Sequence, residues 1–122
     1  MAVRYSLTPN EIAALRALNE GIVEMSGAEV AARSLLLPNK ARTALGHLER
    51  RGFVSSWAPV TGRTGEHLYV VNEPGRNIYR ALQSFKGTPP IGSVVQIRNP
   101  LLGLSHEEYV EITPDEEHVG QS

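Results

Sequence analysis

The side chains of this sequence that are best suited to contacting another molecule lie close together, between Pro38 and Arg51. They are polar or basic, and one further basic residue follows downstream: Asn39, Lys40, Arg42, Thr43, His47 and Arg50, with Arg63. Asparagine pairs with adenine, arginine and lysine pair with guanine or phosphate, and threonine and histidine pair with either. We therefore expect this run to recognise a nucleic acid.

The residue patterns of common catalytic and metal sites are missing from the sequence. The chain has no cysteine, which excludes disulfides, thiolate zinc sites and thiol nucleophiles. Its four histidines show neither metal-ligand spacing nor a carboxylate at a catalytic offset. The stretch from Thr61 to Gly65 is too short for a phosphate-binding loop and lacks its lysine. We expect a protein without enzymatic activity, cofactor or metal.

The net charge of −1 conceals an uneven distribution along the chain. Residues 1–86 carry eleven basic and seven acidic side chains, a balance of +4, whereas residues 87–122 carry one basic and six acidic side chains, a balance of −5. Between residues 33 and 63 the balance reaches +5, with six basic side chains against Glu49. Positive charge is thus concentrated around the polar run, as binding to a phosphate backbone requires.

The length and hydropathy of the chain indicate one soluble domain with an appendage. A length of 122 residues is too short for two ordinary domains. No apolar run approaches the roughly 20 residues that a membrane span requires. Residues 1–7 lack the basic and then hydrophobic pattern of a secretory signal. We expect a cytoplasmic protein.

A helix from about Pro38 to Arg51 would hold the polar run on one side. Four apolar residues recur at helical spacing on the opposite side: Ala41, Ala44, Leu45 and Leu48. Pro38 suits the first helical position, and Gly52 ends the helix after two basic residues that complement its negative end.

Two further helices precede this one, and each begins with a capping box. Thr8 and Glu11 predict a helix over Pro9 to Glu20, and Ser26 and Glu29 predict a short helix over Gly27 to Ser34. Hydrophobic staples support both starts, with Leu7 packing on Ile12 and Met25 on Val30. The short helix, a tight turn and the helix at Pro38 together form a helix-turn-helix.

Two strand-like runs follow, at residues 53–58 and 66–71, and a turn-rich loop at residues 59–65 joins them. Their β-branched and aromatic residues predict a hairpin, the wing, with Arg63 at its tip. We interpret Trp57 and Tyr69 as hairpin core rather than as platforms for base stacking.

The last predicted helix starts after Asn72, which can cap it, and continues to about Phe85. Its apolar stripe suggests a homodimer interface made by Ile78, Leu82 and Phe85. The Gly- and Pro-containing stretch after Lys86 marks a domain boundary, which divides the chain into a domain at 1–86 and an acidic extension at 87–122.

The extension gives weaker signals than the domain. Residues 93–97 fit a short strand, residues 105–108 fit one helical turn, and residues 113–122 have little to bury, so we expect them to be disordered. Three roles remain open for the acidic tail: a phosphate mimic that covers the basic face, a docking segment for a protein partner, or a solubilising tail.

The stretch from Glu29 to Val54 resembles the core of winged helix-turn-helix regulators of the MarR, PadR and ArsR kinds. Leu45, Leu48, Gly52, Phe53 and Val54 occupy the places of the Leu-x-x-Leu-x-x-x-Gly-Leu-Val pattern. Downstream, the run at 68–72 followed by Gly75 resembles the second wing strand and the start of the next helix. The resemblance covers roughly residues 8–86 and implies a DNA-binding domain.

Three residues depart from the family pattern. Leu35 stands where a glycine is common in the turn, and Leu37 stands where a serine or threonine usually caps the recognition helix. Gly46 lies inside that helix, at a cost of about 0.5–1 kcal/mol relative to alanine. A glycine at this position would let a phosphate or a partner backbone approach closely.

These observations predict an α+β fold, mainly α, with a three-helix core, a wing, a C-terminal helix and an acidic extension. The function that we expect is sequence-specific regulation of transcription by a homodimer on double-stranded DNA. The helix at 38–51 would enter the major groove, and the tip at 59–65 would touch the flanking groove or backbone. The alternative is a winged helix that serves as a protein-protein interaction module within a larger nucleoprotein assembly.

Overall fold

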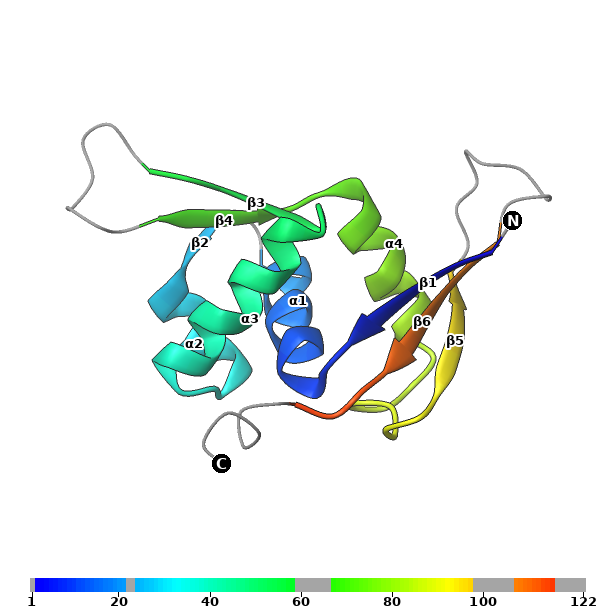
Figure 1. The fold of residues 1–122 in the computed structure, drawn as a ribbon. Coiled ribbons are helices and arrows are strands. Elements are labelled where there is room, and N and C mark those ends of the chain that lie inside the picture. Colours follow the sequence, from blue (N-terminus) through cyan, green and yellow to red (C-terminus); the bar gives the residue numbers. More distant parts are fainter. Residues whose placement is uncertain (1, 22–23, 59–66, 98–106, 116–122) are drawn as a thin grey trace, which may run out of the picture.

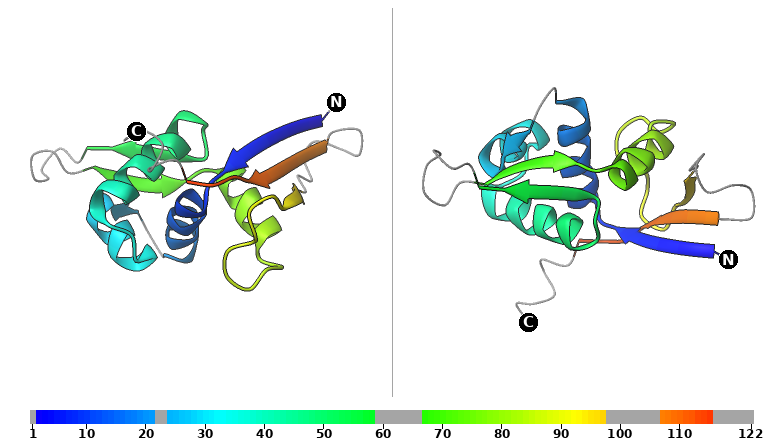
Figure 2. Two further views of the ribbon diagram at one scale, coloured as in Figure 1. Left: turned by 60° about the horizontal axis from the view of Figure 1, so that its bottom comes forward. Right: turned by 90° about the horizontal axis from the view of Figure 1, so that it is seen from above.

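The computed structural model describes residues 2–21, 24–58, 67–97 and 107–115. Within these ranges a helical core lies between two small sheets, the wing sheet at one end of the molecule and a terminal sheet at the other (Figure 1). The views in Figure 2 show the same arrangement from two other sides. The mixed α+β fold with a three-helix core and a hairpin wing is confirmed.

The three core helices are α1 (Pro9–Glu20), α2 (Gly27–Ser34) and α3 (Pro38–Arg50). Both predicted capping boxes form, since Glu11 N donates to Thr8 Oγ1 at 3.2 Å and Glu29 N donates to Ser26 Oγ at 3.2 Å. Among the described helices, none combines the length and the apolar character needed to cross a bilayer.

The turn between α2 and α3 is built around a leucine with left-handed backbone. Leu35 has a φ of 60° and a ψ of 33°, and Leu36 N donates to Ala31 O at 3.0 Å, which closes the end of α2. A left-handed conformation costs an ordinary residue about 1–2 kcal/mol. Leu37 follows as the N-cap of α3 without a side-chain hydrogen bond. The turn therefore keeps the helix-turn-helix geometry although it lacks the usual glycine and capping hydroxyl.

The wing sheet contains β2 (Met25–Ser26), β4 (Leu68–Val71) and β3 (Val54–Trp57), in that order. Strands β3 and β4 form the predicted antiparallel hairpin, with Val54 opposite Val71 and Trp57 opposite Leu68. The expectation that Trp57 belongs to the hairpin core is wrong, because its side chain lies on the outer face of the sheet and is 45% exposed.

The last helix is α4 (Glu73–Leu82), and Asn72 is its N-cap residue. The side chain of Asn72 makes no capping hydrogen bond. Its Nδ2 donates to Gly52 O at 3.1 Å instead, and its Oδ1 accepts from Ser55 Oγ at 3.0 Å. Asn72 thus joins the base of the wing to the end of α3.

The predicted dimer interface on this helix is wrong for two of its three residues. Ile78 and Leu82 are each only 1% exposed, because α4 packs against α1 and against the strand β5 (Val94–Ile97). Phe85 is half-buried. The apolar stripe of α4 is therefore part of the intramolecular core, and a dimer would need a different surface.

The terminal sheet joins the two ends of the chain and has the strand order β1 (Ala2–Leu7), β6 (Glu107–Ile112), β5. Strand β1 runs parallel to β6, and β5 runs antiparallel to it. The strand in residues 93–97 is confirmed, β1 was not predicted, and Glu107 and Glu108 lie in a strand rather than in the predicted helical turn. The period of two in β6, with Val110 and Ile112 buried, fits a strand with one face on the core.

The first residues of the expected disordered tail are hydrogen-bonded to the domain. Thr113 N donates to Leu7 O at 2.8 Å, and Asp115 Oδ1 accepts from Asn10 N at 3.2 Å in the first turn of α1. An acidic side chain at a helix N-terminus is favourable because of the helix dipole. Residues 116–122 lie outside the described part of the chain. The division of the chain at residue 86 stays a prediction.

One continuous core connects the helices to both sheets. Tyr5 of β1 meets Phe53, the residue just before β3, in an edge-to-face ring contact, with centroids 5.3 Å apart and planes at 78°. Gly75 lies beside this contact, and a Cβ at that position would collide with the backbone oxygen of Phe53 and approach Val71 Cγ2 to 2.8 Å. The packing of α4 on the wing therefore explains this glycine.

Gly75→Ala should destabilise the protein by about 1–3 kcal/mol, because overpacking forces the backbone apart. The matched variant is Gly46→Ala, since a Cβ at Gly46 meets no atom within 4 Å. That variant should stabilise the protein by about 0.5–1 kcal/mol through helix propensity. Urea unfolding followed by circular dichroism measures both changes, and equal stabilities would contradict the close packing at Gly75.

Candidate nucleic-acid interface

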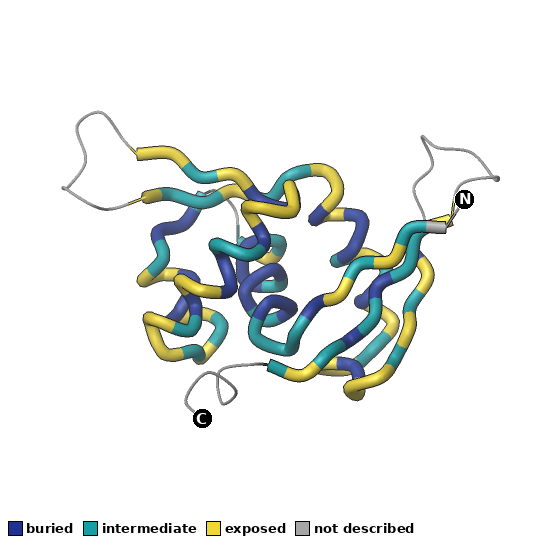
Figure 3. The backbone as a smooth tube through the Cα atoms, in the orientation of Figure 1, coloured by how far each residue is buried: buried dark blue, intermediate teal, exposed yellow. Residues whose placement is uncertain are grey.

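Helix α3 has one buried and one exposed face. Its four apolar residues, Ala41, Ala44, Leu45 and Leu48, are at most 3% exposed and pack on α1 and α2. Asn39, Arg42, Thr43 and Arg50 are exposed on the other side, and Lys40, Gly46 and His47 are half-buried. Figure 3 shows the exposed turns at the start of α3 beside those of α2. The structure thus brings six of the seven predicted contact residues together on one helix.

Two of the exposed residues are linked along the helix, and another lies near the wing. Thr43 Oγ1 donates to the backbone oxygen of Asn39 at 3.0 Å. The Asn39 side chain takes no part in this bond and is exposed. The pKa of Tyr69 on β4 is raised by burial and by the negative charge of Glu49, and the positive charge of Arg42 opposes this increase. The positive charge of Arg42 on α3 therefore acts on Tyr69 of the wing sheet.

Glu11 is the main residue of this region that the sequence reasoning did not assign to the site. Its side chain is 3% exposed, and its carboxylate accepts from Thr8 N at 3.1 Å and lies 3.0 Å from His47 Nδ1. The guanidinium of Arg51 also donates to Glu11 Oε1, at 3.4 Å. This carboxylate consequently connects the start of α1 to the last turn of α3.

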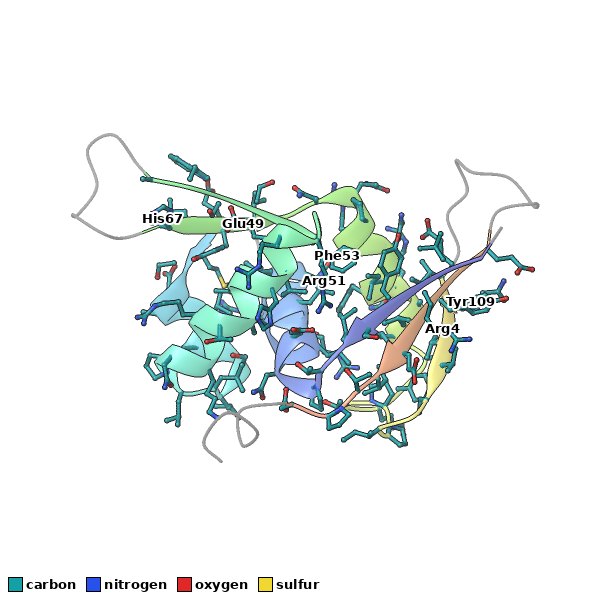
Figure 4. The ribbon with its side chains drawn as sticks, viewed as in Figure 1. Arg4, Glu49, Arg51, Phe53, His67 and Tyr109 are labelled. Carbon is teal, nitrogen blue, oxygen red and sulfur yellow. The ribbon has the colours of Figure 1, made fainter. Side chains whose placement is uncertain are left out.

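Arg51 extends the same connection to the terminal sheet. Its guanidinium also donates to Ser6 O of β1, and Figure 4 shows the side chain between the end of α3 and that strand. The predicted contact residue His47 is thus tied to the core through its Nδ1, which faces Glu11. A sequence signal for Glu11 exists, because it shares a helical face with Leu15 and Leu18, both buried in the core.

Polar contacts also fix the wing relative to α3. Glu49 points from α3 toward the hairpin (Figure 4), and its Oε2 accepts from Ser56 Oγ at 2.7 Å. Together with the Asn72 contacts at the base of the hairpin, this bond sets the angle between the helix and the wing. Arg63 and the predicted wing tip at 59–65 lie outside the described residues. The two strands that lead to and from the tip are described and form the hairpin.

No contact among the described residues explains the glycine at position 46. Gly46 lies in the middle of α3, one turn after Arg42 and Thr43, and no atom of the described residues lies within 4 Å of where its Cβ would be. The helix therefore bears the conformational cost of a glycine without any packing contact to offset it. Along the exposed face, Gly46 is the point where another molecule can come closest to the α3 backbone.

Comparisons with known proteins find the fold but no sequence family. No protein-family model and no curated protein matches the sequence. Among solved structures, BpsR of Bordetella bronchiseptica, whose DNA binding is regulated by 6-hydroxynicotinic acid, superposes with a TM-score of 0.57 at 19% identity. The match covers 64% of this chain and 58% of BpsR.

Two other regulators give similar values. PcaV of Streptomyces coelicolor, solved with its natural ligand, superposes with a TM-score of 0.55 at 20% identity. The match covers 61% of this chain and 51% of the PcaV chain. A MarR-family regulator of Rhodococcus sp. RHA1 has a TM-score of 0.54 at 21% identity, with 62% and 51% covered. This chain spans slightly more than half the length of each. The resemblance seen in the sequence is confirmed as a fold, a winged helix.

Glu11→Ala should lower the free energy of unfolding by about 1–3 kcal/mol, since it removes hydrogen bonds to a buried charged group. The matched variant is Glu29→Ala, which removes the equivalent capping box of α2 from an exposed residue and should cost about 1 kcal/mol. Chemical denaturation measures the difference. If the two variants lose the same stability, the contacts of Glu11 with His47 and Arg51 contribute nothing.

Proposed function

We propose that this chain is a DNA-binding transcriptional regulator that inserts α3 into the major groove of double-stranded DNA. The observation that carries the proposal is the position of α3, which buries its apolar face and leaves Asn39, Arg42 and Thr43 exposed on the other. These residues lie in the first half of the helix, which enters the groove most deeply in helix-turn-helix proteins. Their side chains can hydrogen-bond base edges and phosphates.

Electrostatics support the same assignment. The balance of +5 between residues 33 and 63 is carried largely by α3 and the segment after it. Lysine and arginine side chains that replace the counterions of DNA make affinity depend strongly on salt. In this proposal Arg42 reads a base, Lys40 and Arg50 contact phosphates, and Arg63 in the wing reaches the flanking groove or backbone. His47 contributes through its second ring nitrogen, since Nδ1 faces Glu11.

The regulator would act without enzymatic chemistry, in the cytoplasm and as a homodimer. PcaV and the Rhodococcus protein, which share this fold, are transcriptional regulators, and BpsR is a protein whose DNA binding is regulated. A two-fold axis would place two recognition helices about one turn of DNA, roughly 34 Å, apart. The dimer contact would use a surface other than Ile78 and Leu82, which are buried. A protein partner for the acidic tail stays a prediction.

Arg42→Ala should weaken binding to a selected DNA site by about 1–3 kcal/mol if Arg42 contacts a base. Arg4→Ala is the control, because Arg4 is an exposed arginine on the terminal sheet that pairs with Glu111 at 3.6 Å. Fluorescence anisotropy at several salt concentrations, on a site selected from a randomised pool, gives the affinities. The wild-type affinity should fall steeply with salt, and salt-insensitive or absent binding would overturn the proposal.

Gly46→Ala should weaken DNA binding although it stabilises the fold. An added methyl group on the exposed face would hold the phosphate or base away from the α3 backbone. The control is Ala32→Gly in exposed α2, a change of the same single methyl group outside α3. Its affinity should be that of the wild type when measured well below the unfolding temperature. Unchanged binding by Gly46→Ala would show that DNA does not approach the helix at this residue.

A second candidate function is a protein-protein interaction module, which the outer face of the wing favours. Trp57 and Val70 share that face and are 45% and 40% exposed. Exposed apolar side chains in a group are typical of binding surfaces. Selection from a randomised DNA pool separates the two candidates. No enrichment of any sequence, together with loss of a partner upon Trp57→Ala but not upon Arg42→Ala, would favour the module.

A further inference from the structure

Strand β5 is an edge strand whose outward backbone groups have no partner strand among the described residues. Ile112 N donates to Ser93 O at 2.9 Å, so the hydrogen-bonded pairs with β6 alternate from Ser93 onward. The amide and carbonyl groups of Val94 and Gln96 therefore point away from β6. Figure 1 shows β5 (yellow) at the outer side of the terminal sheet, and Figure 3 shows the exposed residues along it.

The edge strand β5 is short, with four residues, but neither a charged side chain nor a proline protects it against pairing. Residues 91–97 contain no charged residue and no proline. Val94 is 48% exposed, and Ile91, just before the strand, is 59% exposed. Native proteins usually protect an open edge with lysine, proline or a bulge, because an unprotected edge pairs with another strand. An uncharged, partly apolar edge is therefore a surface that another strand can cover.

The opposite edge of the same sheet is protected. Thr113 N donates to Leu7 O on the inner side of β1, so Arg4 and Ser6 direct their backbone groups outward. Arg4 places a charge on this edge, and the guanidinium of Arg51 occupies Ser6 O. The contrast within one sheet indicates that β5 in particular is available for pairing.

We propose that β5 pairs antiparallel with β5 of a second copy of this chain, across a two-fold axis, so that the two terminal sheets join. A two-fold axis brings each residue near its own copy, so a charged edge would repel itself, whereas the neutral run at 91–97 does not. Val94 and Ile91 would be covered in the same contact. Because α4 packs on the inner side of β5, the pairing would also extend the core of each subunit.

This pairing deepens the proposed function by naming the dimer surface that the buried residues of α4 do not supply. Only its use on DNA rests on the proposed function, and the pairing itself can be tested without DNA. It leaves the exposed face of α3 free, because that face belongs to a different part of the molecule from the terminal sheet (Figure 1).

Single cysteines test the pairing directly, because the natural chain has none. Val94→Cys and Gln96→Cys are oxidised separately and as a mixture, since the register of the two strands decides which cysteines meet. At least one of these three samples should form a covalent dimer on a non-reducing gel. The matched control is Ser6→Cys, at an exposed position on the protected edge, which keeps the charge of Arg4 and the backbone oxygen that Arg51 occupies, and it should stay monomeric. No covalent dimer from any of the three samples, or an equal yield from Ser6→Cys, would overturn the proposal.

Sedimentation of the natural chain and of Val94→Lys provides the second measurement. The natural chain, with a subunit mass of 13.3 kDa, should sediment as a dimer. The Val94→Lys variant should sediment as a monomer and keep the circular dichroism spectrum of the natural chain. A monomeric natural chain at all concentrations, or a dimeric Val94→Lys variant, would contradict the pairing. DNA binding separates this result from the proposed function: a monomer that still binds a half-site would disprove the β5 contact alone.

Discussion

The arrangement of the helices depends on one buried carboxylate. Glu11 belongs to the capping box that starts α1, and the same side chain receives His47 and Arg51 from the end of α3. A charge taken out of water must be hydrogen-bonded, because an unpaired buried charge is costly. The requirement to satisfy this carboxylate fixes where α3 ends relative to α1. Through Arg51 and Ser6 O it also fixes the position of β1.

The two sheets have different relations to this core. The wing sheet is attached to α3 by polar contacts, from Glu49 to Ser56 and from Asn72 to Gly52 and Ser55, so its direction follows that of the helix. The terminal sheet contributes apolar side chains from both ends of the chain, and Leu7, Val110 and Ile112 are almost fully buried. A surface used for contacts on α3 can therefore be separate from a surface used for association on β5.

Local signals made most of the domain predictable. The capping boxes at Thr8 and Ser26 mark helix starts by hydrogen bonds within four residues, and Pro38 marks one by its fixed φ and missing N–H. All three helices begin as predicted. The polar face of α3 was predictable from its spacing. The roles of Ile78 and Leu82 were not, since an apolar stripe indicates that a surface is covered without indicating what covers it. The exposure of Trp57 was not either, because it depends on which face of the hairpin packs on the helices. Strand β1 was missed because its partner β6 lies about a hundred residues away.

The sequence by itself determined the positions of the helices and the wing, and it placed the basic and polar side chains on one helix, because these properties follow from short-range periodicity and capping. Only the tertiary structure decided that the acidic segment from Glu107 to Ile112 is a strand between β1 and β5. It likewise decided that Glu11 is the partner of His47 and that β5 has no partner strand on its outer side among the described residues. Each of these features depends on contacts between segments far apart in the chain, and such contacts leave no pattern within any one of them.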